Sequence, residues 1–108
     1  MESKQAIEAL GALAQTSRLA VFRLLVQAGA HGMAAGKIAE RLDVSPATLS
    51  FHLAYLTRAG LATSRQEGRF VIYSADFDGM GRLLAYLTDD CCGGKACVVV
   101  PTRRAARS

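Results

Sequence analysis

The segment Asp43-Val44-Ser45-Pro46 constrains the fold of this chain most, because it joins two short helical patterns through a tight turn. Residues 35–42 predict the first helix, with Ile38 and Leu42 facing inward. Ser45 is a good N-cap for the second helix, and Pro46 suits its first position, where a missing N–H matters little. Two short helices joined in this way are typical of a helix-turn-helix, although a generic helical hairpin has the same spacing.

The second of these helices is followed directly by a predicted β-hairpin. Leu49, Leu53 and Leu56 form the buried stripe of the helix, which Ala59-Gly60 ends. Residues 61–66 and 70–75 then predict two strands around Glu67-Gly68, the second of them rich in β-branched and aromatic residues. A hairpin in this place is the wing of a winged helix, and it favours the DNA-binding reading over the generic one.

Three further helices complete the predicted fold. The apolar stripe of the first helix consists of Ile7, Leu10, Leu13 and Ala14. The second helix is capped by Thr16 or Ser17 and ends at Ala28-Gly29, and its stripe consists of Leu19, Phe22, Leu25 and Val26. The last helix is capped by Asp76 or Asp78, and its apolar face consists of Met80, Leu83, Leu84 and Leu87. The predicted class is α+β, mainly α: a winged helix-turn-helix with four helices, two strands and a fifth helix.

Length and composition favour one domain that is completed by a second copy. The 108 residues show no internal repeat, so we expect a DNA-binding and dimerisation domain over 1–90 and a C-terminal segment with a basic tail over 91–108. The first and last helices predict a homodimer interface through Ile7, Leu10, Leu83, Leu84 and Leu87, unless both helices simply pack on their own core. We expect a cytoplasmic protein without membrane contact, because no apolar run approaches about 20 residues and no signal core follows the N-terminus.

The helix that begins after Ser45 carries the residues expected to contact DNA. Its exposed side is predicted to offer Ala47, Thr48, Ser50, Phe51, His52 and Tyr55; of these, Ser45, Ala47, Thr48, Ser50 and His52 are the candidate DNA contacts, joined by Arg65 and Arg69 at the wing. A net charge of +4 agrees with a nucleic-acid partner. The competing interpretations are ordinary helix caps, a surface histidine and a solvated charged surface.

All three cysteines, Cys91, Cys92 and Cys97, lie within seven residues near the C-terminus and are spaced by Gly93-Gly94. Three soft thiolates select thiophilic centres, whereas structural zinc usually takes four ligands. Copper(I), cadmium, lead and mercury remain candidates, and a disulfide-based redox switch is the main alternative. An enzyme is not expected, because the chain has no phosphate-cradling loop, no Cys-x-x-Cys before a helix and no Cys/His/Asp arrangement that places a base.

The chain resembles the ArsR/SmtB family of metal-sensing repressors over about residues 5–90. The similarity rests on Ala14-Gln15-Thr16-Ser17-Arg18-Leu19, Ile38-Ala39-Glu40-Arg41-Leu42, Ser45-Pro46-Ala47-Thr48-Leu49-Ser50-Phe51-His52-Leu53 and Gly60-Leu61. The resemblance implies a homodimeric winged-helix repressor that leaves its operator DNA when a metal or metalloid binds.

Two metal sites of this family are not supported by the sequence. Residues 31–37 contain no cysteine, and residues 78–88 contain no histidine or glutamate. The Cys-Cys-Gly-Gly tail is instead similar to an arsenic-responsive subgroup. That resemblance implies trivalent arsenic, or antimony, bound as inducer by Cys91, Cys92 and Cys97, with arsenite, antimonite and methylarsenite as candidates and no required cofactor. The alternative is a DNA-binding regulator that senses thiol oxidation or a soft metal.

Overall fold

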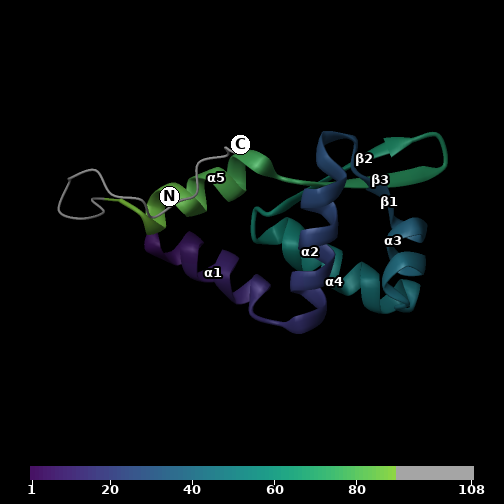
Figure 1. The fold of residues 1–108 in the computed structure, drawn as a ribbon, viewed down its shortest axis with the longest axis horizontal. Coiled ribbons are helices and arrows are strands. Elements are labelled where there is room, and N and C mark those ends of the chain that lie inside the picture. The colour runs from purple at the N-terminus through teal and green to yellow at the C-terminus, as the bar shows by residue number, and fades with distance from the viewer. Residues whose placement is uncertain (90–108) are drawn as a thin grey trace.

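A computed structural model describes residues 1–89 as a mainly helical chain with a small antiparallel sheet, which confirms the predicted winged helix-turn-helix (Figure 1). The elements are α1 (Ser3–Leu13), α2 (Thr16–Ala28), the short 3-10 helix η1 (Gly29–His31), β1 (Met33–Ala34), α3 (Ala35–Leu42), α4 (Pro46–Arg58), β2 (Ala62–Glu67), β3 (Phe70–Ala75) and α5 (Phe77–Leu87). No single helix in this part of the chain has the length and apolarity to cross a bilayer; only α1 with the stretch from Thr16 to His31 passes by length and composition, as a pair bent by 99°.

The core forms where α2, α3 and α4 pack together. Leu49, Leu53 and Leu56 of α4 are fully buried there, as their spacing predicts. The inward face of α1, however, consists of alanines, namely Ala6, Ala9 and Ala12. Ile7 and Leu10 of the predicted α1 stripe are exposed, as residues of a dimer interface would be in a single chain; Leu19 of α2 is exposed as well. Small side chains let α1 approach the core closely, and its larger residues then face outward.

The helix caps agree with the sequence in two cases and differ in one. Ser45 caps α4 and Asp76 caps α5, both as predicted. The cap of α2 is neither Thr16 nor Ser17 but Gln15, whose side-chain oxygen accepts a hydrogen bond from the backbone N–H of Arg18 at 2.8 Å. A glutamine is long enough to bend back onto the first turn, so it replaces the shorter hydroxyls.

The sheet has three strands, one more than predicted, in the order β1-β3-β2. In β1, Met33 pairs with Tyr73 and Ala34 pairs with Ile72. The residue before β1 has to be a glycine. Gly32 has φ +72°, and a Cβ at this position would lie 2.3 Å from the carbonyl oxygen of Tyr73. Two residues are too few to show an alternation of buried and exposed side chains, so β1 is defined only by its pairing with β3.

Helix α5 is joined to the rest of the chain at both of its ends. At its start the backbone N–H of Asp76 donates to the carbonyl of Leu61 at 2.9 Å, and Gly79 packs on the backbone of Gly60. Near its end the hydroxyl of Tyr86 hydrogen-bonds to that of Ser3 in α1. Helices α1 and α5 therefore lie side by side, at the end of the molecule opposite the β2–β3 hairpin (Figure 1).

One residue of the predicted dimer interface is buried within its own chain. Leu83 is only 5% exposed, because its position on α5 faces the core together with Gly79. Its placement on the outer surface was therefore wrong. Ile7, Leu10, Leu84 and Leu87 do lie on the surface. The expected C-terminal segment 91–108, with its three cysteines, lies outside the described residues.

Candidate nucleic-acid interface

Helix α4 has a clear outward face, which lies opposite its buried leucines. At about 100° per residue, the direction opposite Leu49, Leu53 and Leu56 is occupied by positions 47, 51, 54 and 58. All four of these residues, Ala47, Phe51, Ala54 and Arg58, are exposed in the structure. We call these four residues the outer stripe of α4. It is the surface that a helix-turn-helix presents to the major groove.

The N-terminal turn of α4 is fixed by its cap. The Ser45 hydroxyl accepts a hydrogen bond from the backbone N–H of Thr48 at 3.1 Å and lies 2.9 Å from the Thr48 hydroxyl, to which it donates. The hydroxyl hydrogen of Thr48 consequently stays free to donate outward. Ser45, Ala47, Thr48 and Ser50 are all exposed, as expected for candidate DNA contacts.

His52 does not lie on this face, and its expected exposure was wrong. It is 6% exposed, on the side of α4 that turns toward the start of α2. Its Nδ1 has no hydrogen-bond partner among residues 1–89. Desolvation by this burial, followed by the nearby positive charge of Arg18, lowers the pKa of His52 below 6.5. The histidine is therefore a neutral, packed side chain at neutral pH.

Arg18 contacts Tyr55 on this side of α4. Its guanidinium carbon lies 4.0 Å from the centre of the Tyr55 ring, and its Nε donates to the carbonyl of Ala12 at 2.8 Å. Tyr55, which was expected to be exposed, is consequently half-buried. Since Arg18 is held by both contacts, it remains close to His52 and disfavours the charged imidazolium.

The burial of His52 makes a prediction for stability against pH. An unfolded His52 titrates near pH 6.5, whereas the folded one takes up its proton only at lower pH. Between these two values the unfolded chain binds more protons, so the free energy of unfolding rises with pH and levels off above about 6.5. Urea unfolding between pH 5.5 and 7.5 measures this slope, which we expect to be smaller in His52→Gln.

The exposed His31 provides the matched control for this experiment. His31→Gln should leave the slope close to that of the unmodified protein. Equal slopes in the His52→Gln variant and the unmodified protein would contradict the assignment of the pH dependence to His52.

The two arginines of the wing have different surroundings. Arg65 is engaged within the chain: it donates to Glu67 at 2.6 Å and to the carbonyl of His31 at 2.7 Å, with Ser74 Oγ at 3.4 Å. It thus braces β2 against η1, which its position in the sequence did not suggest. Arg69 lies at the tip of the hairpin, with its guanidinium 5.6 Å from the ring of Phe70. Arg69 is therefore the wing cation that is better placed to meet a phosphate.

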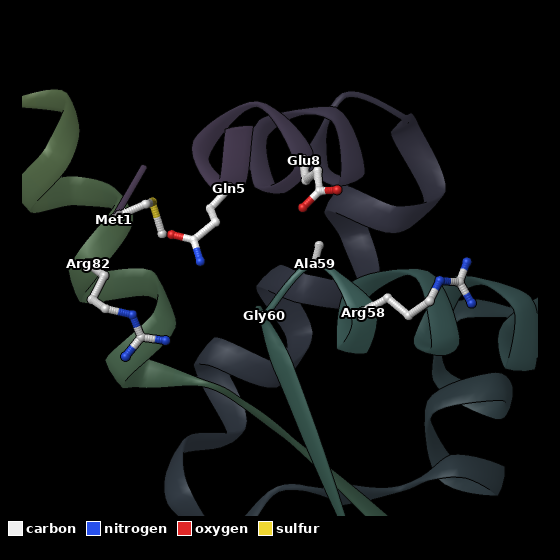
Figure 2. Close-up of a pocket in the computed structure, with 7 residues that line it drawn as sticks. All are labelled: Met1, Gln5, Glu8, Arg58, Ala59, Gly60 and Arg82. Carbon is white, nitrogen blue, oxygen red and sulfur yellow. The ribbon is translucent and has the colours of Figure 1, made fainter. Parts of the chain in front are cut away.

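Helix α4 also ends beside a hollow of about 170 Å³ that α1 and α5 complete. Figure 2 shows Gln5 and Glu8 of α1 on one side of this hollow and Ala59 and Gly60 on the other, with Arg58 and Arg82 at opposite ends. A second pocket of about 480 Å³ adjoins it and shares Glu8, Arg58 and Ala59. Because the two guanidinium groups do not converge, the hollow is not a built anion site.

No group of three or more histidine, cysteine, aspartate or glutamate side chains within residues 1–89 is arranged to hold a metal ion. The predicted ligands Cys91, Cys92 and Cys97 follow this part of the chain. Their geometry is outside the described residues, so the metalloid site stays a prediction.

Comparison with known proteins points to one class of regulator. A family model described as a helix-turn-helix domain matches residues 13–65. The transcriptional activator HlyU of Vibrio cholerae is 35% identical over 72 residues, which cover 67% of this chain and 64% of that relative. The chain thus spans slightly less than two thirds of this curated relative. The solved structure of HlyU from the same organism has a TM-score of 0.63 at 33% identity, with 81% of this chain and 97% of the solved chain covered.

Two further solved structures are similar over most of the chain. One is a solution structure of a homodimeric winged helix-turn-helix DNA-binding domain from Mycobacterium bovis, described as a possible ArsR-family regulator, with a TM-score of 0.66, 27% identity and 87% of each chain covered. The other is described as a "possible transcriptional regulator for arsenical resistance", with a TM-score of 0.64, 32% identity and 74% and 80% of the two chains covered. HlyU is thus described as a transcriptional activator, and the other two are described as possible regulators of transcription. The chain belongs to the ArsR/SmtB family of winged helix-turn-helix transcriptional regulators.

Proposed function

We propose that this chain is a transcriptional repressor that binds operator DNA as a homodimer and releases it when trivalent arsenic binds Cys91, Cys92 and Cys97. The observation that carries the DNA-binding part is the exposed outer stripe of α4, whose N-terminal turn is capped and which is followed directly by the wing with Arg69. Lys37 and Arg41 of α3 are also exposed and add positive charge on the neighbouring helix. Such cations supply the salt-sensitive part of DNA affinity.

Dimerisation is supported by apolar side chains that the single chain leaves uncovered. Ile7 is 68% exposed and Leu87 is 53% exposed, and Leu10 and Leu84 accompany them on α1 and α5. These two helices lie side by side, and their exposed apolar side chains are available for a two-fold contact. The Mycobacterium bovis relative, which is described as homodimeric, supports dimerisation. Two copies would present two α4 helices to two operator half-sites.

The arsenic part of the proposal is supported by the position of the cysteines. Cys91 follows Leu87, the last residue of α5, by four residues. Three thiolates satisfy a trivalent arsenic without a fourth ligand, and soft sulfur is the donor that thiophilic centres prefer. The relative described as a possible regulator for arsenical resistance supports this choice of inducer.

The way α5 is attached suggests how such binding would reach the DNA-binding face. Ligation by Cys97 would close a loop at the C-terminal end of α5. The start of α5 is joined to the junction of α4 and β2 through Asp76 on Leu61 and through Gly79 on Gly60. A shift of α5 would therefore act on the end of α4 as well as on the dimer surface. A coupling of about 1–3 kcal/mol weakens DNA binding about 5–150-fold.

The proposal predicts the outcome of a fluorescence anisotropy titration. A labelled duplex is selected from a randomised library with the full-length protein, and arsenite is then added under reducing conditions. We expect a fall in affinity of about 5–150-fold. Cys92→Ser should lose the response but keep its arsenite-free affinity. An unchanged affinity with arsenite would refute the arsenic part, and loss of DNA binding in Cys92→Ser would show that the cysteine is structural.

A redox sensor is the second candidate function, and the description of one relative supports it. A similar solved structure is described as reduced HlyU from Vibrio cholerae, at 29% identity and a TM-score of 0.61. The same titration separates the two functions if peroxide is tested beside arsenite, antimonite and a panel of soft metal ions. Release by peroxide alone would favour the redox sensor, and release by cadmium, lead or copper(I) alone would favour a soft-metal sensor.

A further inference from the structure

Phe51 lies at the centre of the outer stripe of α4 and is 59% exposed. Its neighbours along the stripe are Ala47 and Ala54, which are too small to cover it. A large apolar side chain in the middle of this stripe can touch an apolar group on a base edge when the helix lies in the major groove.

Apart from Arg58, its last residue, which lies beside α1, the same helix lacks the side chains that recognise bases through paired hydrogen bonds. Between Pro46 and Thr57 there is no arginine, lysine, asparagine or glutamine. Guanine is recognised mainly by arginine or lysine and adenine by asparagine or glutamine, so neither purine is selected by such pairs here. The hydroxyls of Thr48 and Ser50 bond to several bases and discriminate weakly. The remaining distinctive feature of the major groove is the C5-methyl group of thymine, which selects apolar partners.

The Phe51 ring is supported from the side rather than from above. Its centre lies 5.9 Å from that of His52 at an interplanar angle of 61°, and 6.2 Å from that of Tyr55 at 70°. Both are edge-to-face contacts, which favour a defined ring orientation. Tyr55 is in turn held under Arg18. The ring is therefore pre-oriented by packed neighbours while much of its surface stays free.

We propose that Phe51 recognises thymine methyl groups in the major groove, so that the operator half-site carries thymine at the base pair facing this residue. The inference rests on the proposed DNA binding and specifies its chemistry: recognition by apolar contact, with hydroxyls and phosphate contacts fixing the register. Ala47, on the same stripe one turn nearer the N-terminus, extends the apolar contact.

The test replaces thymine by uracil, which removes only the C5-methyl group. Duplexes are first selected from a randomised library with the full-length protein, and the preferred duplex is resynthesised with uracil at single positions. Burial of one methyl-sized group corresponds to about a fourfold change in affinity, or about 15-fold when both half-sites are substituted. We expect this loss at one position per half-site, with little effect at the others.

Substitutions then assign the effect to the side chain. Phe51→Ala should bind the thymine and uracil duplexes equally, with an unchanged melting temperature because the ring is largely exposed. Phe77→Ala, which removes an exposed phenylalanine at the start of α5, should keep the full difference. Phe51→Arg should shift the selected base at this position toward guanine.

The outcomes separate this inference from the proposed function. If no duplex is enriched from the library, the proposed DNA binding fails. If a duplex is enriched but uracil binds as tightly as thymine at every position, DNA binding stands and the methyl recognition is wrong. A thymine preference that persists in Phe51→Ala would likewise overturn the role of Phe51.

Discussion

Gly79→Ala is expected to lower the free energy of unfolding by about 3 kcal/mol, the upper end of the usual effect of overpacking. A Cβ at this position would lie 2.0 Å from the carbonyl oxygen of Gly60. The obstacle is backbone and not the end of a flexible side chain, so α5 has to move away from the junction of α4 and β2. Urea unfolding followed by circular dichroism measures the loss.

Gly81 provides the matched control, because it lies on the same helix two residues later. A Cβ there meets nothing within 4 Å. Gly81→Ala should therefore leave stability unchanged or raise it by up to about 1 kcal/mol, since alanine is the better helix former. Equal effects of the two substitutions would show that the close approach of Gly79 to Gly60 does not matter for stability.

The parts of the fold that depend on local chemistry could be predicted from the sequence. Ser45 and Asp76 cap their helices because each places an acceptor beside the free N–H groups of a first turn. Leu49, Leu53 and Leu56 are buried because their spacing puts them on one side of α4. The two strands of the wing follow from a run of β-favouring residues on one side of a Gly turn.

The parts that depend on tertiary contacts were missed. Strand β1 exists only through its pairing with β3. Nothing in the sequence indicates that Arg65, a predicted DNA contact, donates to the carbonyl of His31, which lies 34 residues earlier. In α1, the apolar stripe gave no sign that Ala6, Ala9 and Ala12 form the buried face, which close packing against the core selects.

The candidate site could have been predicted more sharply from the sequence. The helical face opposite the buried leucines of α4 contains Phe51 and Ala54 but not His52. His52 was predicted as a DNA contact only because it is polar. The cysteine site is different, because its prediction rests on sequence and resemblance and its residues follow the described part of the chain.

Leu87→Glu is expected to convert the protein from dimer to monomer at micromolar concentration. Leu87 is about half exposed in the single chain, and Leu84 of α5 and Ile7 and Leu10 of the neighbouring α1 are exposed as well. Burial of such a side chain contributes about 1.5 kcal/mol, and two-fold symmetry counts it twice, so the dimer is weakened by about 3 kcal/mol or roughly a hundredfold. Sedimentation equilibrium measures the mass and the dissociation constant directly.

The control for this experiment is Val71→Glu, which places the same charge on an exposed apolar position of β3 at the opposite end of the molecule (Figure 1). It should remain dimeric. A Leu87→Glu protein that also stays dimeric would place the interface elsewhere than on α1 and α5, and it would remove the route by which a ligand at the end of α5 changes the spacing of the two α4 helices. A monomer that keeps its melting temperature but binds the selected duplex much more weakly would show that both half-sites must be contacted together, since one α4 and one wing supply only half of the contacts.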